Sequence, residues 1–115
     1  MDLVEYQGMS DDELYTLLGA ELLGEGVGLS PEDEEEQRRF GKQWFTDKHR
    51  DLQRKICHHE RIQPFLGTSG SDRVIDAAAI AELLTDDFGP TSVIVAVLIA
   101  RIGLGAFCQN APAPR

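Results

Sequence analysis

The sequence predicts an all-α fold, a compact orthogonal bundle of four to six helices with a buried apolar helix near the C-terminus. Apolar residues recur at three- and four-residue spacing in several segments, and helix start signals precede them. The one strongly β-branched run, residues 93–100, has no second segment of similar quality to pair with in a sheet. The length of 115 residues fits one domain. We therefore expect a single helical domain over residues 1–110 and a disordered Ala/Pro tail over 111–115.

The first helix is predicted to begin after Ser10 and to end at Gly24. Ser10 and Glu13 have the spacing of a capping box, in which each side chain accepts a hydrogen bond from the other residue's backbone N–H. An apolar stripe follows at helical spacing, formed by Leu14, Leu17, Leu18 and Leu22. The glycine-rich loop 24–28 lacks the flanking strand and the Gly-Lys-Ser/Thr sequence of a phosphate-binding loop, which excludes that interpretation.

The second helix is predicted to begin at Pro31, with Ser30 as its cap, and to continue to about Ile62. Unbroken, it would be about 48 Å long. A domain of this size has a radius of gyration of about 13–14 Å. We therefore expect a bend or break near Gly41, or else before Cys57.

The second helix is predicted to be amphipathic. Its core face carries Phe45, Leu52 and Ile56, with His49 and His59 on the same seam and Phe40, Trp44 and Ile62 widening the apolar surface. The opposite side is an arginine-rich stripe, formed by Arg39, Gln43, Arg50, Arg54 and Arg61. The stripe is therefore a candidate surface for recognition.

The third helix is predicted over residues 72–85 and the last over 91–107, separated by a break at 86–90. The last helix is apolar all round from Val93 to Ala100, and Arg101 then interrupts it. A membrane span needs about 20 apolar residues, so a core helix is the better interpretation. Four short helices would cover such a helix incompletely. We expect the face with Ile94, Leu98 and Arg101 to approach an edge of the molecule or an acidic neighbour, or else to bind another chain.

Charge is segregated along the chain, whose net charge is −9. Residues 1–36 hold 12 acidic and no basic side chains, whereas residues 37–73 hold 9 basic and 4 acidic ones. This pattern favours pairing between the two regions within one fold, with steering of a charged partner as the alternative. The overall acidity argues against nucleic acid as a partner, because phosphate binding needs a basic excess.

Candidate chemistry is sparse. Cys57, His58 and His59 are adjacent, and adjacent residues on a helix diverge by about 100°, so they do not converge on one metal ion. The chain has only two cysteines, Cys57 and Cys108, and they are far apart in sequence. This predicts free thiols in a reducing compartment, with one disulfide as the alternative. The acidic N-terminus has no signal-peptide pattern. We expect a cytoplasmic protein with no catalytic residues, no metal and no cofactor.

These observations predict a small, non-enzymatic protein–protein interaction module, such as an adaptor, a regulatory subunit or an immunity-type partner. The partner is another protein or a second copy of the chain, and neither nucleic acid nor a membrane is expected. The predicted interaction surface consists of Arg39, Gln43, Arg50, Arg54, Arg61, Ile94, Leu98 and Arg101. The alternative is a metal-binding regulator or small enzyme that uses Cys57, His58 and His59.

Overall fold

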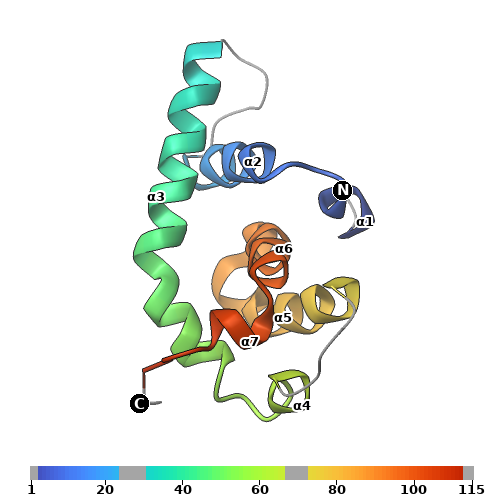
Figure 1. Cartoon of the computed structure of the whole chain (residues 1–115). Coiled ribbons are helices and arrows are strands. Elements are labelled where there is room, and N and C mark those ends of the chain that lie inside the picture. Colours follow the sequence, from blue (N-terminus) through green and yellow to red (C-terminus); the bar gives the residue numbers. More distant parts are fainter. Residues whose placement is uncertain (1–2, 24–30, 67–72, 113–115) are drawn as a thin grey trace.

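Four helices of eleven or more residues build the fold, and shorter helical turns flank them (Figure 1). The computed structural model describes residues 3–23, 31–66 and 73–112, and no strand occurs in these ranges. The predicted all-α class is confirmed. The long helices are α2 (Asp11–Leu23), α3 (Pro31–Ile56), α5 (Arg73–Phe88) and α6 (Ser92–Ile102); the short ones are α1 (Leu3–Gln7), α4 (Gln63–Leu66), η1 (Gly89–Thr91) and α7 (Leu104–Phe107).

Helix α2 begins with the capping box that the sequence predicts. The Glu13 backbone N–H donates to Ser10 Oγ at 3.1 Å, and the Ser10 backbone N–H donates to Glu13 Oε1 at 3.3 Å. Leu14 and Leu18 of the predicted apolar stripe are fully buried. Capping thus fixes the start of α2, and burial of the leucines fixes which side faces the core.

Helices α2 and α3 cross in direct backbone contact (Figure 1). At the crossing, Gly19 lies against the backbone of Gln37, and Gly41 lies against the backbone of Tyr15. A Cβ atom added to either glycine would overlap the facing carbonyl group. The predicted break near Gly41 is therefore wrong. The absence of a side chain at Gly41 instead allows α2 to pack closely against α3.

Helix α3 ends at Ile56, so the second predicted break, before Cys57, is the correct one. Its 26 residues span about 39 Å, close to the longest dimension of the molecule, 43 Å. Phe45, Leu52 and Ile56 are buried as predicted. Phe40 is 41% exposed and does not join the core, which corrects its predicted place on the apolar surface.

Helices α5 and α6 pack against each other as a hairpin turned by η1. Helix α5 continues to Phe88, three residues beyond its predicted end, and Gly89 with φ 54° starts the turn. By length and composition alone, the stretch Ile75–Ile102 could cross a membrane. Because it folds into two packed helices, and because α6 has only eleven residues, it is better explained as core.

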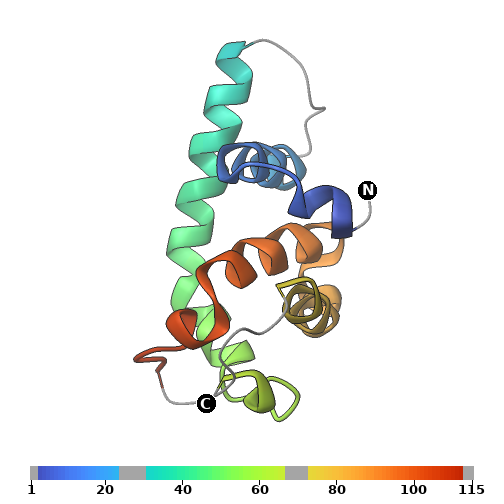
Figure 2. The ribbon, with the colours of Figure 1, turned by 45° about the vertical axis from the view of Figure 1, so that its right-hand side comes forward.

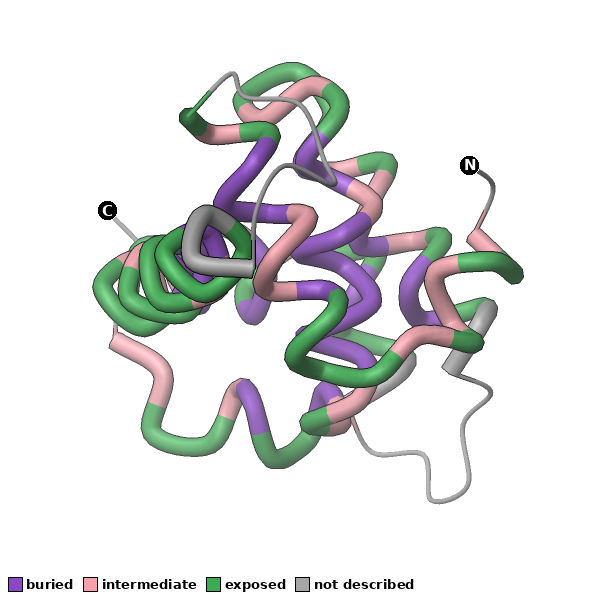
Figure 3. The backbone as a smooth tube through the Cα atoms, turned by 90° about the horizontal axis from the view of Figure 1, so that it is seen from above, coloured by how far each residue is buried: buried purple, intermediate pink, exposed green. Residues whose placement is uncertain are grey.

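Helix α6 lies at the centre of the fold, and every residue from Ile94 to Ala100 is at most 3% exposed (Figure 3). Helices α1, α2, α5, η1 and α7 all contact it. The expectation that the chain covers this helix incompletely is therefore wrong. The sequence interpretation omitted α1 and joined α7 to α6, whereas Gly103, with φ 96°, separates α7 as a distinct turn.

Part of the predicted organisation lies outside the described residues: the loop 24–28, the Ser30 cap, the start of the third helix at Asp72, and residues 113–115 of the tail. Ala111 and Pro112 are described. Ala111 packs on the core, and its backbone N–H donates to the Cys108 carbonyl at 3.1 Å. The ordered segment thus extends past residue 110, where the tail was expected to begin.

Candidate functional site

A polar hollow of about 440 Å³ lies along α3, near the middle of the helix. Among the described residues, its lining comes from α3 alone: Arg38, Arg39, Lys42, Gln43 and Thr46. We call this site the basic groove. Four of these residues are exposed, and Arg38 is partly exposed. The groove thus presents three cationic and two uncharged polar side chains to solvent.

One carboxylate partly offsets the cations of the basic groove. Glu35 Oε1 lies 2.8 Å from Arg39 Nη2 and 3.9 Å from Arg38 Nη2. The Gln43 amide donates to Asp47 Oδ1 at 2.9 Å. Within the described ranges, the Lys42 ammonium has no ion pair. Asp47 is a second carboxylate beside the groove, so two negative charges lie against three positive ones, and the groove keeps a small positive excess on an acidic protein.

The remaining arginines of the predicted stripe lie in different surroundings. Arg50 is exposed on α3, one turn beyond the groove. Arg54 pairs with Asp51 in its own helix at 3.3 Å. Arg61 follows the end of α3, and its Nη1 lies 3.3 Å from Glu82 Oε2 on α5. Only Arg39 and Gln43 of the stripe therefore lie in the groove.

Ile94 and Leu98, also predicted as part of an interaction surface, lie inside the molecule. Ile94 is 1% exposed and Leu98 3% exposed. Both are buried by the chain itself, so neither is accessible to a partner in this structure. The prediction misplaced them because it did not include α1 and did not specify how the other helices pack around α6.

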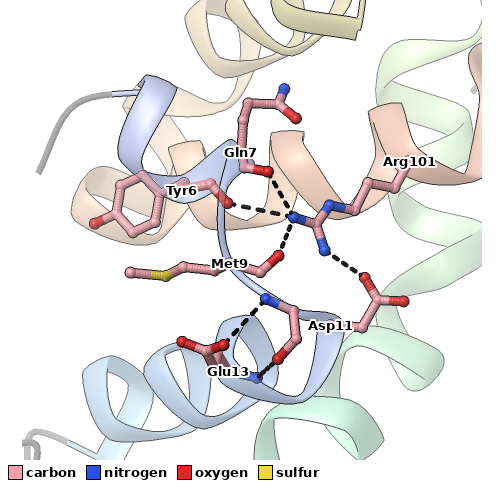
Figure 4. Close-up of polar contacts among 7 residues, drawn as sticks. Tyr6, Gln7, Met9, Asp11, Glu13 and Arg101 are labelled. Atoms are coloured by element: carbon pink, nitrogen blue, oxygen red, sulfur yellow. Dashed lines mark hydrogen bonds and ion pairs between the residues drawn. The ribbon is translucent and has the colours of Figure 1, made fainter.

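Arg101, the last residue of the predicted surface, is committed to contacts within the chain (Figure 4). Its Nη1 donates to Asp11 Oδ1 at 2.7 Å. Its Nη2 donates to the backbone carbonyls of Tyr6 at 3.4 Å and Gln7 at 3.1 Å, and also to that of Met9. The predicted acidic neighbour is thus Asp11, and the guanidinium also caps the end of α1.

Cys57 and Cys108 form a disulfide, which corrects the expectation of free thiols. Their Cα atoms are 5.5 Å apart, a usual separation for this bond. His58 Nε2 lies 2.7 Å from the Pro112 carbonyl oxygen, and His59 Nδ1 accepts a hydrogen bond from the Arg61 backbone N–H at 3.1 Å. In this state Cys57 supplies no thiolate to a metal or a substrate.

The alternative of a metal site at Cys57, His58 and His59 gains no support, because the described ranges contain no group of three or more His, Cys, Asp or Glu side chains placed to hold an ion. No protein-family model, curated protein or solved structure matches the chain. The function is therefore argued from the geometry of the chain itself.

The sequence interpretation missed three residues of the basic groove. Arg38, Lys42 and Thr46 form a row at four-residue spacing, which places them on one face of a helix. The prediction chose only the row opposite the core, to which Arg39 and Gln43 belong, whereas the groove also includes this neighbouring row. The four-residue spacing was the available signal. Which flank stays uncovered depends on the packing of α2, which the sequence pattern does not specify.

Proposed function

We propose that this protein is a non-enzymatic interaction module that binds an acidic segment of a partner protein in the basic groove of α3. The observation that supports this is the concentration of Arg38, Arg39 and Lys42 in one hollow of a chain whose net charge is −9. Carboxylate side chains match these donors, because arginine guanidinium groups bind them in paired hydrogen bonds and lysine adds a point charge.

An acidic peptide suits the basic groove better than a nucleic acid does. The remainder of the chain is strongly acidic and repels a long polyphosphate, whereas a short segment contacts only the local positive excess. Each exposed ion pair contributes only about 0.2–1 kcal/mol. Several pairs must therefore act together, and binding is expected to weaken as salt rises.

The test is a titration of the labelled protein with a short glutamate-rich peptide, followed by NMR of the backbone amides. We expect saturable shifts centred on residues 38–46, which diminish with added salt. Lys42→Glu should weaken binding about two- to tenfold, because it removes one attraction and adds a repulsion. A peptide of equal length with lysine in place of glutamate should cause no such shifts.

Arg50→Glu is the matched control. It makes the same charge change on the same helix, at an exposed position one turn outside the groove. We expect it to change the affinity by less than about twofold. Equal weakening by both variants would mean that the peptide responds to the general charge of α3, and the absence of saturable shifts would refute the proposal.

A second copy of the chain is one source of the acidic segment, because residues 1–36 hold 12 acidic side chains. Light scattering over a range of protein and salt concentrations identifies this case. A dimer that dissociates at high salt and in the Lys42→Glu variant would assign the partner to the chain itself. A monomer under all conditions would assign the groove to another protein.

A further inference from the structure

The C-terminal segment, residues 103–112, is fastened to the end of α3 by several contacts of different kinds. The Cys57–Cys108 disulfide is the covalent one. The Gln53 amide donates to the Phe107 carbonyl at 2.7 Å, and the rings of His49 and Phe107 lie 4.6 Å apart. In Figure 2 the segment lies beside the end of α3 that is far from its junction with α2.

We propose that the Cys57–Cys108 disulfide is a thiol–disulfide exchange site, and that its reduction frees the C-terminal segment from α3. The segment has little structure of its own to hold it in place. Helix α7 has four residues, which is too short to persist without tertiary contacts. Gly103, with φ 96°, ends the helical conformation between α6 and α7 and provides a point about which the segment can move.

Exposure of the two cysteines determines which sulfur reacts. Cys57 is 3% exposed and lies in the core, whereas Cys108 is partly exposed. A thiolate of an external dithiol protein therefore attacks Cys108 Sγ. The Sγ–Sγ bond breaks, its electron pair passes to Cys57 Sγ, and that sulfur takes up a proton. The reductant's second thiol then displaces Cys108 as a thiol, so the site gains two electrons and two protons while the dithiol becomes a disulfide.

Release of the segment changes the surface that the molecule presents. Phe107 and Leu104, which are 1% and 2% exposed, leave their buried positions when α7 lifts. Gln53 loses its carbonyl acceptor at the same time. The reduced protein therefore presents an apolar surface that the oxidised protein hides. The disulfide lies eleven residues, about three helical turns, beyond Thr46, the last residue that lines the basic groove.

The experiment compares hydrogen exchange in the oxidised and the dithiol-reduced full-length protein. The measured quantity is the exchange rate of residues 104–108 relative to that of α6, because this ratio cancels any change in global stability. We expect reduction to raise the ratio at least about tenfold, and exchange of the segment to become insensitive to low denaturant concentrations. An unchanged ratio would show that the disulfide only stabilises the whole fold, and would overturn the proposal.

Two further measurements keep the proposal open to refutation. A dithiol protein that lacks its second cysteine should be trapped as a mixed disulfide on Cys108, as mass spectrometry of the digested adduct would show. A mixed disulfide on Cys57, or no mixed disulfide until denaturant is added, would contradict the proposal that Cys108 is the sulfur attacked. The Cys57→Ser/Cys108→Ser double variant should show the raised exchange ratio with or without reductant, and a normal ratio there would also count against the proposal.

Discussion

Among single residues, Arg101 has the most contacts that a substitution can test. Its side chain is only 19% exposed, and it connects the end of α6 to the carbonyls that end α1 and to Asp11. Arg101→Ala should lower the free energy of unfolding by about 2 kcal/mol, because several acceptors lose a charged donor. Denaturant titration followed by circular dichroism measures this change.

Asp11→Asn distinguishes the contribution of the ion pair to stability from that of the carbonyl contacts of Arg101. The Asp11 side chain is 65% exposed, so its removal should cost no more than about 0.5 kcal/mol. Arg101→Lys keeps the charge but loses the forked donor, and its stability should fall between those of the other two variants. If Asp11→Asn were as destabilising as Arg101→Ala, the carbonyl contacts would contribute nothing.

An acidic neighbour of Arg101 was one of the alternatives that the sequence predicted, but its backbone acceptors were not predicted. The helical spacing of Ile94, Leu98 and Arg101 placed the arginine beside an apolar face, where a charge needs a partner. The carbonyls of Tyr6 and Gln7 come from a segment more than 90 residues away. Side-chain periodicity carries no information on where a distant backbone carbonyl points.

Among the helices, the close crossing of α2 and α3 depends on two glycines, Gly19 and Gly41, which have no side chain. Gly19→Ala and Gly41→Ala should each destabilise the protein by about 3 kcal/mol, because the new Cβ overlaps a facing backbone that cannot move without separating the helices. Alanine's better helix propensity offsets only about 1 kcal/mol of this. Thermal unfolding of each variant checks the prediction.

Gly105→Ala is the control for the glycine substitutions. Its added Cβ would lie 3.7 Å from the Leu66 carbonyl oxygen, which is an ordinary contact. We expect no destabilisation, and a gain of at most about 1 kcal/mol from alanine's better helix propensity. Similar melting temperatures for Gly19→Ala and Gly105→Ala would disprove the close crossing.

Helix positions followed from the sequence where a local signal exists. The Ser10 capping box fixed the start of α2, and the length argument offered two breaks in α3, of which the one before Cys57 is where the helix ends. Gly41 was misread as a possible break, because a glycine that bends a helix and a glycine that admits a neighbour look alike in one sequence. Helix α1 went unpredicted, because its five residues are too few to show periodicity.

For the molecule as a whole, the fold class was predictable and the pairing of segments was not. An apolar run the length of α6 requires cover from all sides, but the sequence does not say which helices provide it. The charge pattern shows the same limit. Among the described residues, the basic region pairs with the acidic N-terminal region only within α3, where Arg38 and Arg39 lie beside Glu35. Its ion pairs to another helix, Lys55–Asp87 and Arg61–Glu82, reach α5 instead. The Cys57–Cys108 bond, which spans 51 residues, likewise depends on tertiary placement.

Burial of Tyr15 and Tyr6, together with the carboxylates around them, should make the free energy of unfolding depend on pH in the alkaline range. Burial, followed by the charges of Asp11 and Asp12, raises the pKa of Tyr15 above its ordinary value of 10.0. Burial and then Glu21 and Glu5 raise the pKa of Tyr6 in the same direction. The unfolded chain therefore loses these protons at a lower pH than the folded one. The stabilisation is fully present below pH 10 and is lost as the pH rises through the folded pKa, by at most about 1.4 kcal/mol per pH unit for each proton.

Tyr15→Phe tests this dependence while keeping the ring that packs against Phe45 at 6.2 Å. Urea unfolding at a series of pH values from 8 to about 11 should give a shallower decline for the variant than for the natural protein, because one titrating group is gone. Lysine and arginine groups are common to both chains, so the difference between the two slopes isolates Tyr15. Parallel curves would show that Tyr15 ionises equally in both states, and that the acidic region around it does not influence folding at alkaline pH.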